Sequence, residues 1–359
     1  MNEKNGNPCA ARLDEFRRLV ARRRLDRVLV FDRANIRSLT GIDCDSAAFD
    51  LDRLYTDFRY VPMVHRLAPW LKTGDIRRVS APSAGKRAVR RVGYEGSIPH
   101  ARYLALAKAF PKAEFVDLAK DLAALRAVKL PWEIDRLRAA EALNDEIWAE
   151  ASASFRAGMT EREMALAIRR LMISRGDGEA FETIVCVGAN AAECHHVPDG
   201  TVWDGRAPVL VDMGVKLDGY CSDMTRNLVP RRPSPAYRKA YALVLEANCA
   251  AIAAARPGIT GKALDKVSRD IIRKGGFGKA FGHSLGHGVG LEIHEEPYAS
   301  RRSDTVLKPG MLVTIEPGIY LEGNLGVRIE DLVLITETGC EVLSHSPKSD
   351  CEVRSRRRA

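Results

Sequence analysis

Residues 208–214 read Pro-Val-Leu-Val-Asp-Met-Gly, an apolar run that predicts a buried strand with a single carboxylate, Asp212. A second run follows closely, Gly219-Tyr-Cys-Ser-Asp-Met-Thr-Arg226, and it carries Asp223. Two such runs joined by a short turn predict a hairpin. An unpaired carboxylate buried among apolar residues is costly, so each must be paired, protonated or bound to a metal ion.

The same arrangement recurs about one hundred residues later. Residues 311–318 and 326–331 form a second pair of predicted strands, which carry Glu316 and Glu330. Upstream of the two hairpins, residues 155–181 and 255–281 align without a gap and share eight identical positions. Each copy has a Gly and a Thr before an amphipathic helix and a Gly-rich end after it. We interpret the second half as a duplicated unit in which each copy supplies two carboxylates.

Histidines gather in the same region. Five of the eight lie between positions 195 and 294, and three of these belong to the segment Phe281-Gly-His-Ser-Leu-Gly-His-Gly-Val-Gly-Leu-Glu-Ile-His294. The glycines beside His287 allow the backbone to approach a bound group closely. Four carboxylates and one imidazole form an oxygen-rich ligand set that suits a pair of Mn²⁺, Co²⁺ or Zn²⁺ ions.

The first part of the chain reads differently. A helix over residues 11–24, a buried strand over 27–32 and further alternating elements predict an α/β domain. Residues 129–132 are the expected linker, in which Pro131 breaks one helix before Glu133 begins another.

Charge and composition limit the function. The net charge is +9, and residues 1–125 carry all of it, with 24 basic and 15 acidic side chains. The balanced second half makes nucleic acid a minor possibility. The N-terminal segment lacks the apolar core of a signal peptide, and no apolar run is long enough for a membrane span, so we expect a cytoplasmic protein. Disulfides are not expected among the eight scattered cysteines, at positions 9, 44, 186, 194, 221, 249, 340 and 351.

Together these motifs resemble those of the pita-bread metallopeptidases, in the branch of the Xaa-Pro aminopeptidases and Xaa-Pro dipeptidases (prolidases). Residues 35–41 and 55–60 are similar to the creatinase-type N-terminal domain of this family, and residues 128–134 resemble the start of its interdomain helix. The resemblance implies an α/β (α+β) protein with a small creatinase-like α/β domain over 1–127. A pseudo-two-fold pita-bread catalytic domain would then span 128–359.

The resemblance also implies a dinuclear metal centre. The ligands map onto Asp212, Asp223, His287, Glu316 and Glu330. In the family, the residues matching Asp223 and Glu330 bridge both ions, Asp212 completes one ion, and His287 with Glu316 completes the other. The implied cofactors are two divalent ions, Mn²⁺ first, with Co²⁺ or Zn²⁺ as alternatives.

The implied reaction is hydrolysis, in which a hydroxide bridging the two ions attacks the first peptide bond. Glu316 would carry the proton to the leaving nitrogen, His294 would donate to the oxyanion, and His195 would position the scissile bond. An apolar pocket for the proline ring is expected from His283, Phe181 and Tyr320.

Two further residue pairs are expected near the centre. Thr225 and Arg328 would orient Asp223 and Glu330. Glu193-Cys194 stands where relatives usually carry a small residue and proline, so the loop before His195 is expected to differ in shape.

We therefore expect a metal-dependent exopeptidase, an Xaa-Pro aminopeptidase that cuts before a penultimate proline. An Xaa-Pro dipeptidase is the alternative, and it must also hold the C-terminal carboxylate of its substrate. A creatinase-like amidinohydrolase or a non-catalytic binding module would have lost ligands, whereas all five are present. Methionine aminopeptidase activity is not expected, because those relatives lack this N-terminal domain. The resemblance further implies a homodimer in which the N-terminal domain of one subunit approaches the active site of the other.

Overall fold

The structure is a computed structural model that describes residues 7–79 and 89–348, and the chain divides into two compact units, Met1–Arg126 and Ala127–Ala359. This division lies one residue from the expected boundary. No helix of the described residues is both long and apolar enough to cross a membrane. The seven cysteines among them are free thiols, and Cys351 lies outside the described residues.

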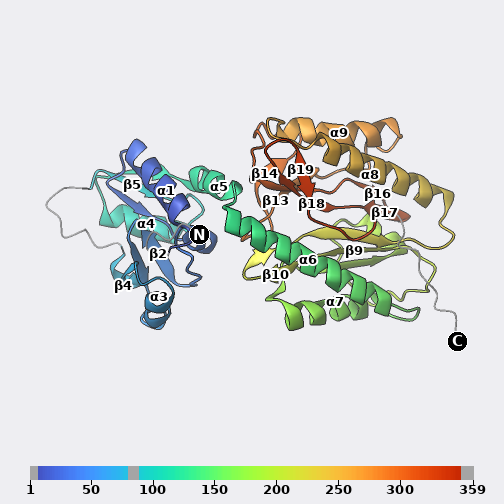
Figure 1. Ribbon diagram of the computed structural model, residues 1–359, viewed down its shortest axis with the longest axis horizontal. Coiled ribbons are helices and arrows are strands. Elements are labelled where there is room, and N and C mark those ends of the chain that lie inside the picture. The colour runs from blue at the N-terminus through green and yellow to red at the C-terminus, as the bar shows by residue number, and fades with distance from the viewer. Residues whose placement is uncertain (1–6, 80–88, 349–359) are drawn as a thin grey trace. The chain divides into compact units, whose positions relative to one another are not determined.

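The N-terminal unit contains two small sheets with helices around them (Figure 1). One sheet is parallel with the order β1-β5-β6, and the other has the order β2-β3-β4. The elements are α1 (Ala10–Arg22), β1 (Arg27–Leu29), α2 (Arg33–Thr40), β2 (Ala47–Asp50), β3 (Arg53–Thr56), α3 (Val61–Leu67), β4 (Lys72–Asp75), η1 (Ile76–Arg78), β5 (Arg91–Tyr94), α4 (His100–Ala109), β6 (Glu114–Asp117) and α5 (Ala119–Ala127). The helix and strand expected at the start of the chain are α1 and β1, each shorter than expected.

The second unit opens with long helices and continues through short strands. Its elements are α6 (Pro131–Ser154), α7 (Glu161–Arg175), β7 (Gly178–Glu179), β8 (Ile184–Val187), η2 (Gly188–Ala192), β9 (Val209–Met213), β10 (Val215–Leu217), β11 (Tyr220–Cys221), β12 (Met224–Leu228), α8 (Pro235–Ala254), α9 (Gly261–Lys274), β13 (Gly286–Gly288), β14 (Glu295–Ala299), β15 (Leu312–Ile315), β16 (Gly318–Leu321), β17 (Leu325–Arg328), β18 (Asp331–Ile335) and β19 (Cys340–Val342). Pro131 does not break a helix before Glu133. It is the first residue of α6, where the missing N–H has no helical partner to lose.

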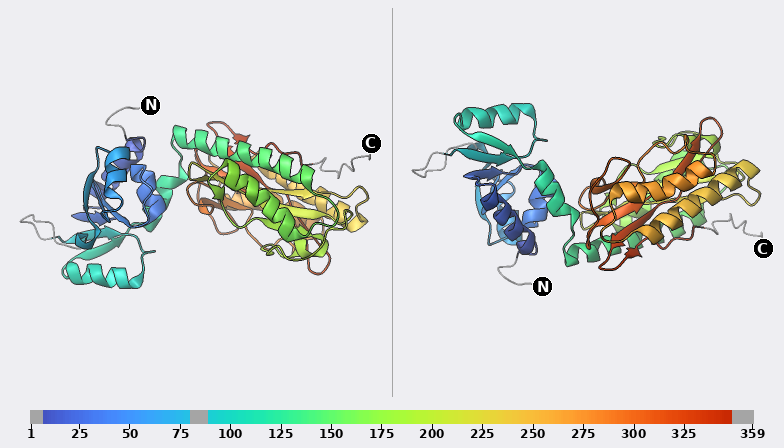
Figure 2. Two further views of the ribbon diagram at one scale, coloured as in Figure 1. Left: turned by 90° about the horizontal axis from the view of Figure 1, so that it is seen from below. Right: turned by 90° about the horizontal axis from the view of Figure 1, so that it is seen from above.

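The strands of this unit lie between two pairs of helices, α6 and α7 on one side and α8 and α9 on the other (Figures 1 and 2). Each pair buries its apolar face against its own strands. Met164 and Ile168 of α7 share a core with Val211 of β9, and Leu264 of α9 shares a core with Val313 of β15. The fold class expected from the motifs is therefore the one observed.

The predicted repeat has a structural counterpart at the start of α7 and α9. The Thr160 hydroxyl accepts from Glu163 N and the Thr260 hydroxyl from Ala263 N, so both threonines are N-caps. Two residues earlier in each copy, a glycine adopts a left-handed conformation, with φ of 94° and 90°. Each threonine also pairs with a distant valine in an isolated antiparallel bridge, to Val202 and Val306. The identical glycines and threonines of the two copies thus form the same capped turn at the start of α7 and of α9.

The strands expected to carry the carboxylates are interrupted where three of those carboxylates lie. Asp223 falls between β11 and β12, Glu316 follows the end of β15, and Glu330 falls between β17 and β18. Only Asp212 lies inside a strand, β9. Because a residue outside the regular ladder is not held to the strict alternation of a strand, its side chain is free to turn toward a common centre.

Candidate metal centre

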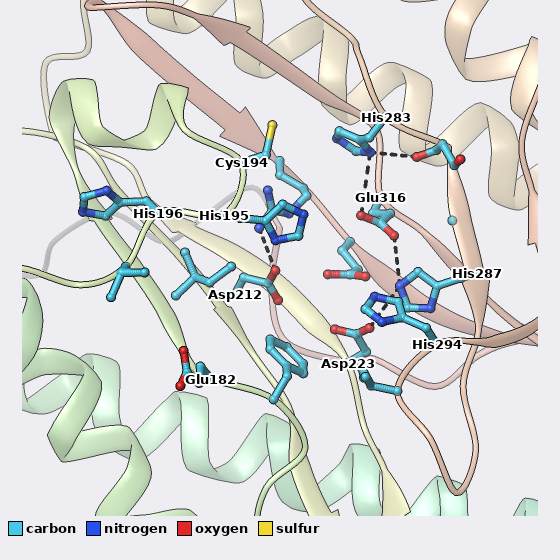
Figure 3. A pocket seen from close by; sticks show the side chains of 18 of the residues that line it. Glu182, Cys194, His195, His196, Asp212, Asp223, His283, His287, His294 and Glu316 are labelled. Carbon is cyan, nitrogen blue, oxygen red and sulfur yellow. Dashed lines mark hydrogen bonds and ion pairs between the residues drawn. The ribbon is translucent and has the colours of Figure 1, made fainter. Parts of the chain in front are cut away.

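Five side chains from both copies of the repeat line one cavity, and all of them except Glu330 are labelled in Figure 3. They are Asp212, Asp223, His287, Glu316 and Glu330, which all line a cavity of about 530 Å³. Three of them, Asp223, His287 and Glu330, bring one ligand atom each to within 4.8 Å of one another.

His287 stands on the short strand β13, whose close packing requires the glycine before it. A Cβ at Gly286 would collide with the carbonyl oxygen of Thr314. The Nδ1–H of His287 donates to Gly288 O at 3.1 Å, so the lone pair is on Nε2. Burial, helped by His294, lowers the pKa of His287 to about 4, which keeps the ring neutral.

The free nitrogen of His287 faces acceptors. Nε2 lies 3.3 Å from Glu316 Oε1 and 3.6 Å from Asp223 Oδ2. A lone pair and two carboxylate oxygens turned toward one another require a cation or extra protons between them. Zn²⁺, Mn²⁺ and similar divalent ions accept nitrogen and oxygen ligands of this kind.

The carboxylates show the same need for positive charge. Burial raises the pKa of Glu316 to about 8, with Arg328 opposing the shift and Asp212 adding to it. Burial and the neighbouring carboxylates also raise the pKa of Asp223 and Glu330 well above their usual range. Asp212 Oδ1 is buried without a hydrogen-bond partner among the described residues. The donor set therefore fits the pair of divalent ions that the resemblance implies.

Arg328 and two threonines hold the ligands in place. Arg328 is buried in β17 and donates to Asp212 Oδ2 at 2.6 Å and to Thr225 Oγ1 at 2.9 Å. The Thr225 hydroxyl in turn donates to Glu330 Oε2 at 2.7 Å. The expectation was that these two residues orient Asp223 and Glu330. In the structure Thr225 binds Glu330, whereas Arg328 binds Asp212 and is linked to Glu330 through Thr225.

Thr314, in strand β15 of the second hairpin, also supports this centre, and sequence reasoning missed it. Its hydroxyl accepts from His287 N and donates to Glu316 Oε1, both at 3.0 Å. Both threonines stand two residues from a candidate ligand carboxylate, Thr225 after Asp223 and Thr314 before Glu316. That spacing is the signal in the sequence that marks them.

Glu141 on α6 was also missed. It is fully buried, and its carboxylate accepts from Asp223 N at 3.1 Å and from Ser344 Oγ at 2.7 Å. Burial raises its pKa to about 8. A glutamate on the same helical face as Leu137 and Asn144, which are also buried, is the sequence signal for this contact.

Four of the five other residues expected to act on the substrate belong to the wall of the cavity. His195, His283, His294 and Phe181 line it. Tyr320 is not among the lining residues. Its hydroxyl accepts a hydrogen bond from Arg328 and donates one to His283 Nε2, both at 2.9 Å, so it fixes the orientation of the His283 ring. With Nδ1 donating to Ser284 O, neither nitrogen of His283 is free for a substrate.

Models of two families match the chain, metallopeptidase family M24 at residues 135–337 and the creatinase/prolidase N-terminal domain at residues 12–128. An Xaa-Pro dipeptidase from Lactobacillus helveticus is 42% identical over 255 residues, 70% of this chain and 69% of that protein. An Xaa-Pro dipeptidase structure from Bacillus anthracis superposes with a TM-score of 0.89 at 32% identity, covering 95% of this chain and 99% of that one. An X-Pro aminopeptidase structure from Thermotoga maritima superposes with a TM-score of 0.83 at 31% identity, covering 94% of this chain and 99% of that one. These matches confirm the family resemblance that the motifs indicated.

Proposed function

The chain belongs to metallopeptidase family M24 and is a hydrolase acting on peptide bonds, and we propose that it removes an N-terminal residue that precedes a proline. The observation that carries this proposal is the convergence of five metal-ligand side chains beside a wall formed by Phe181 and His283. The printed names of the relatives and structural neighbours, which are Xaa-Pro dipeptidases and an X-Pro aminopeptidase, support the same substrate class.

Two divalent ions would supply Lewis acidity and lower the pKa of water at this centre when bound. The residues of the chain supply the proton transfer. Glu316 Oε1 is occupied by the Thr314 hydroxyl, whereas Oε2 faces His283 at 3.9 Å. We therefore assign to Oε2 the proton that leaves the attacking water and reaches the leaving nitrogen.

Two histidines at the cavity mouth would act on the substrate carbonyl. His195 and His294 both keep solvent-exposed surface, and the partial burial of the His294 ring, together with nearby His195, lowers the pKa of His294. A neutral imidazole at this position donates one N–H to the oxyanion that develops in the transition state. Phe181 and the neutral ring of His283 would hold the proline ring.

Substrate length separates the two candidate activities. Among the described residues that line the cavity, Arg328 is the only lysine or arginine, and its nitrogens already contact Asp212, Thr225 and Tyr320. This favours an aminopeptidase, because a dipeptidase needs a cation for the C-terminal carboxylate. The names of the Lactobacillus helveticus and Bacillus anthracis relatives favour a dipeptidase.

We also propose Mn²⁺ as the ion, since the ligand set is dominated by carboxylate oxygens. A cytoplasmic homodimer belongs to the same proposal and rests on the family resemblance. Light scattering of the purified protein tests the dimer, and a monomeric mass would exclude it.

The decisive experiment compares three peptides on the Mn²⁺-loaded protein: an Xaa-Pro dipeptide, the matching Xaa-Pro-Yaa tripeptide and an Xaa-Ala-Yaa control. We expect release of the first residue from at least one proline peptide and much slower release from the control. Cleavage of the tripeptide identifies an aminopeptidase, and cleavage of the dipeptide alone identifies a dipeptidase. Equal cleavage of the alanine control, or no metal-dependent cleavage at all, contradicts the proposal.

A further inference from the structure

A second cluster of ionisable side chains lies beside the cavity, formed by Glu161, His196 and Asp199, with one ligand atom of each within 4.8 Å. The ring nitrogens of His196 both face carboxylate oxygens, Nε2 at 2.7 Å from Glu161 and Nδ1 at 3.2 Å from Glu193. Burial of this ring lowers its pKa, but the hydrogen bonds to the two carboxylates outweigh burial and raise it. Because each ring nitrogen already lies at hydrogen-bond distance from a carboxylate oxygen, we interpret the cluster as a hydrogen-bonded Glu161–His196 pair with Glu193 on the other side of the ring, and not as a metal site.

Glu161 is the anchor of this pair. It is the first residue of α7, fully buried, and both of its carboxylate oxygens are used. Oε1 accepts from Val187 N at 2.6 Å and Asn190 Nδ2 at 2.9 Å, and Oε2 accepts from His196 Nε2 and from Asp199 N at 3.0 Å. The single carboxylate of Glu161 thus accepts four hydrogen bonds from the segment 187–199. It stands at a helix N-terminus, where the helix dipole favours negative charge.

That segment carries His195. His195 and His196 are neighbours in the chain, yet their rings lie on opposite sides of the backbone between them (Figure 3). The ring of His195 turns toward Asp212, whereas that of His196 binds Glu161. We propose that the Glu161–His196 pair is a positioning device that fixes residues 193–199 and thereby holds the ring of His195 over the metal centre. This inference rests on the role of His195 in the proposed function.

The position of His195 needs such support because its own side chain is exposed at the cavity mouth. A loop residue that is not held would sample several orientations. Displacing a group that acts on the substrate by about 1 Å costs up to about 100-fold in rate. The adjacent residue is the natural place for a constraint, because its side chain fixes the peptide unit from which the His195 ring projects.

The test uses the Mn²⁺-loaded full-length protein and a cleaved Xaa-Pro peptide. His196→Ala removes the donor to Glu161, whereas His196→Gln keeps an N–H near the place of Nε2. We expect kcat/KM to fall by about 10- to 100-fold in His196→Ala, with the loss divided between kcat and KM as in His195→Ala. His196→Gln is expected to keep most of the activity. His345→Ala, at an exposed histidine of the same unit, is the matched control and should behave as the unaltered protein.

A double-mutant cycle then separates positioning from general destabilisation. If His196 acts through His195, His196→Ala causes no further loss in a His195→Ala background, and the affinity for Mn²⁺ is unchanged in every variant. An equal loss in both backgrounds, or activity retained in His196→Ala while His195→Ala is impaired, overturns the positioning role of His196. Either result leaves the proposed function unaffected. Full activity of His195→Ala contradicts the role of His195 in the proposed function, and the inference falls with it.

Discussion

Removing metal ions from the protein should make its stability fall as the pH rises from about 6.5 to 8. The cause is the group of buried carboxyls in the metal centre. Burial raises the pKa of Glu316 to about 8 from an ordinary value of 4.5, and raises the pKa of Asp223 and Glu330 as well. Between the ordinary and the raised value, the folded metal-free protein holds a proton that the unfolded chain has released. Unfolding free energy therefore decreases with pH in this window.

The lower limit of the window follows from the histidines. Burial lowers the pKa of His283 and His287 to about 4, so the unfolded chain binds protons there that the folded protein does not. These rings make stability rise with pH up to about 6.5, the ordinary histidine value. Above that value the carboxyls determine the sign, together with Glu141 and His196, whose raised pKa acts in the same direction.

The expected size comes from the linkage relation. Each carboxyl that is protonated only in the folded state contributes a slope of about 1.4 kcal/mol per pH unit. Glu316 alone then accounts for about 2 kcal/mol between pH 6.5 and 8. For a unit of this size, that loss lowers the melting temperature by about 4–8 °C.

Scanning calorimetry on matched samples, one with EDTA and one with excess Mn²⁺, measures the effect. Glu141 and His196 are common to both samples, so the gap between the two melting temperatures isolates the metal centre. We expect that gap to widen steadily from pH 6.5 to 8, and Glu316→Gln in EDTA to show a shallower decline. A metal-free melting temperature that stays level or rises across this window, or a gap of constant width, would refute the reasoning.

Three further predictions test individual contacts. Asp223→Asn should lose Mn²⁺ binding and at least about 100-fold of the peptidase activity; calorimetric titration and a peptide assay check both, and retention of the two would exclude Asp223 as a ligand. Glu141→Ala removes the acceptor of the Asp223 N–H and should weaken Mn²⁺ binding about 10- to 100-fold, whereas Glu141→Gln, which keeps an acceptor, should bind almost normally. Thr314→Val leaves the His287 N–H unpaired and should lower the unfolding free energy by about 1–3 kcal/mol, measured by urea unfolding, while Ser174→Ala on the exposed face of α7 should leave it unchanged.

The motifs predicted the duplicated hairpins, the family and the fold class because these depend on local pattern and on the order of residues in the chain. They did not predict that the strands stop at Asp223, Glu316 and Glu330. The pattern of apolar and polar residues does not show where the backbone hydrogen bonding of a strand is interrupted. Contacts with distant segments determine that position. The sequence interpretation therefore named five side chains that the structure brings together, without the backbone geometry that directs them inward.

Contacts between distant segments account for the other differences. The sequence placed Tyr320 in the proline pocket as an aromatic residue, but its hydroxyl binds Arg328 and His283. Glu141 and Glu161 lie in helices, where glutamate is most often exposed, so residue type alone does not mark them as buried. Their burial depends on backbone N–H groups that are 82 and 26 residues away, those of Asp223 and Val187. No periodicity within one helix contains that information.

The duplication also explains why the two halves of the catalytic unit form a single site. Each half supplies two of the proposed ligand carboxylates, and the buried arginine of each half pairs with a carboxylate of the other half. Arg328 of the second half pairs with Asp212 of the first, and Arg226 of the first half donates to Asp331 of the second at 2.8 Å and to the carbonyl oxygen of Glu330 at 2.5 Å. Separating the halves would leave Asp212 without Arg328 and Arg226 without Asp331, and breaking a buried pair in this way costs about 3–5 kcal/mol. Asp331 itself would keep a second cation, Lys348, at 2.7 Å. Each half therefore contains a buried arginine whose carboxylate partner lies in the other half, and the contact between Arg328 and Asp212 that joins the halves also fixes one of the proposed metal ligands.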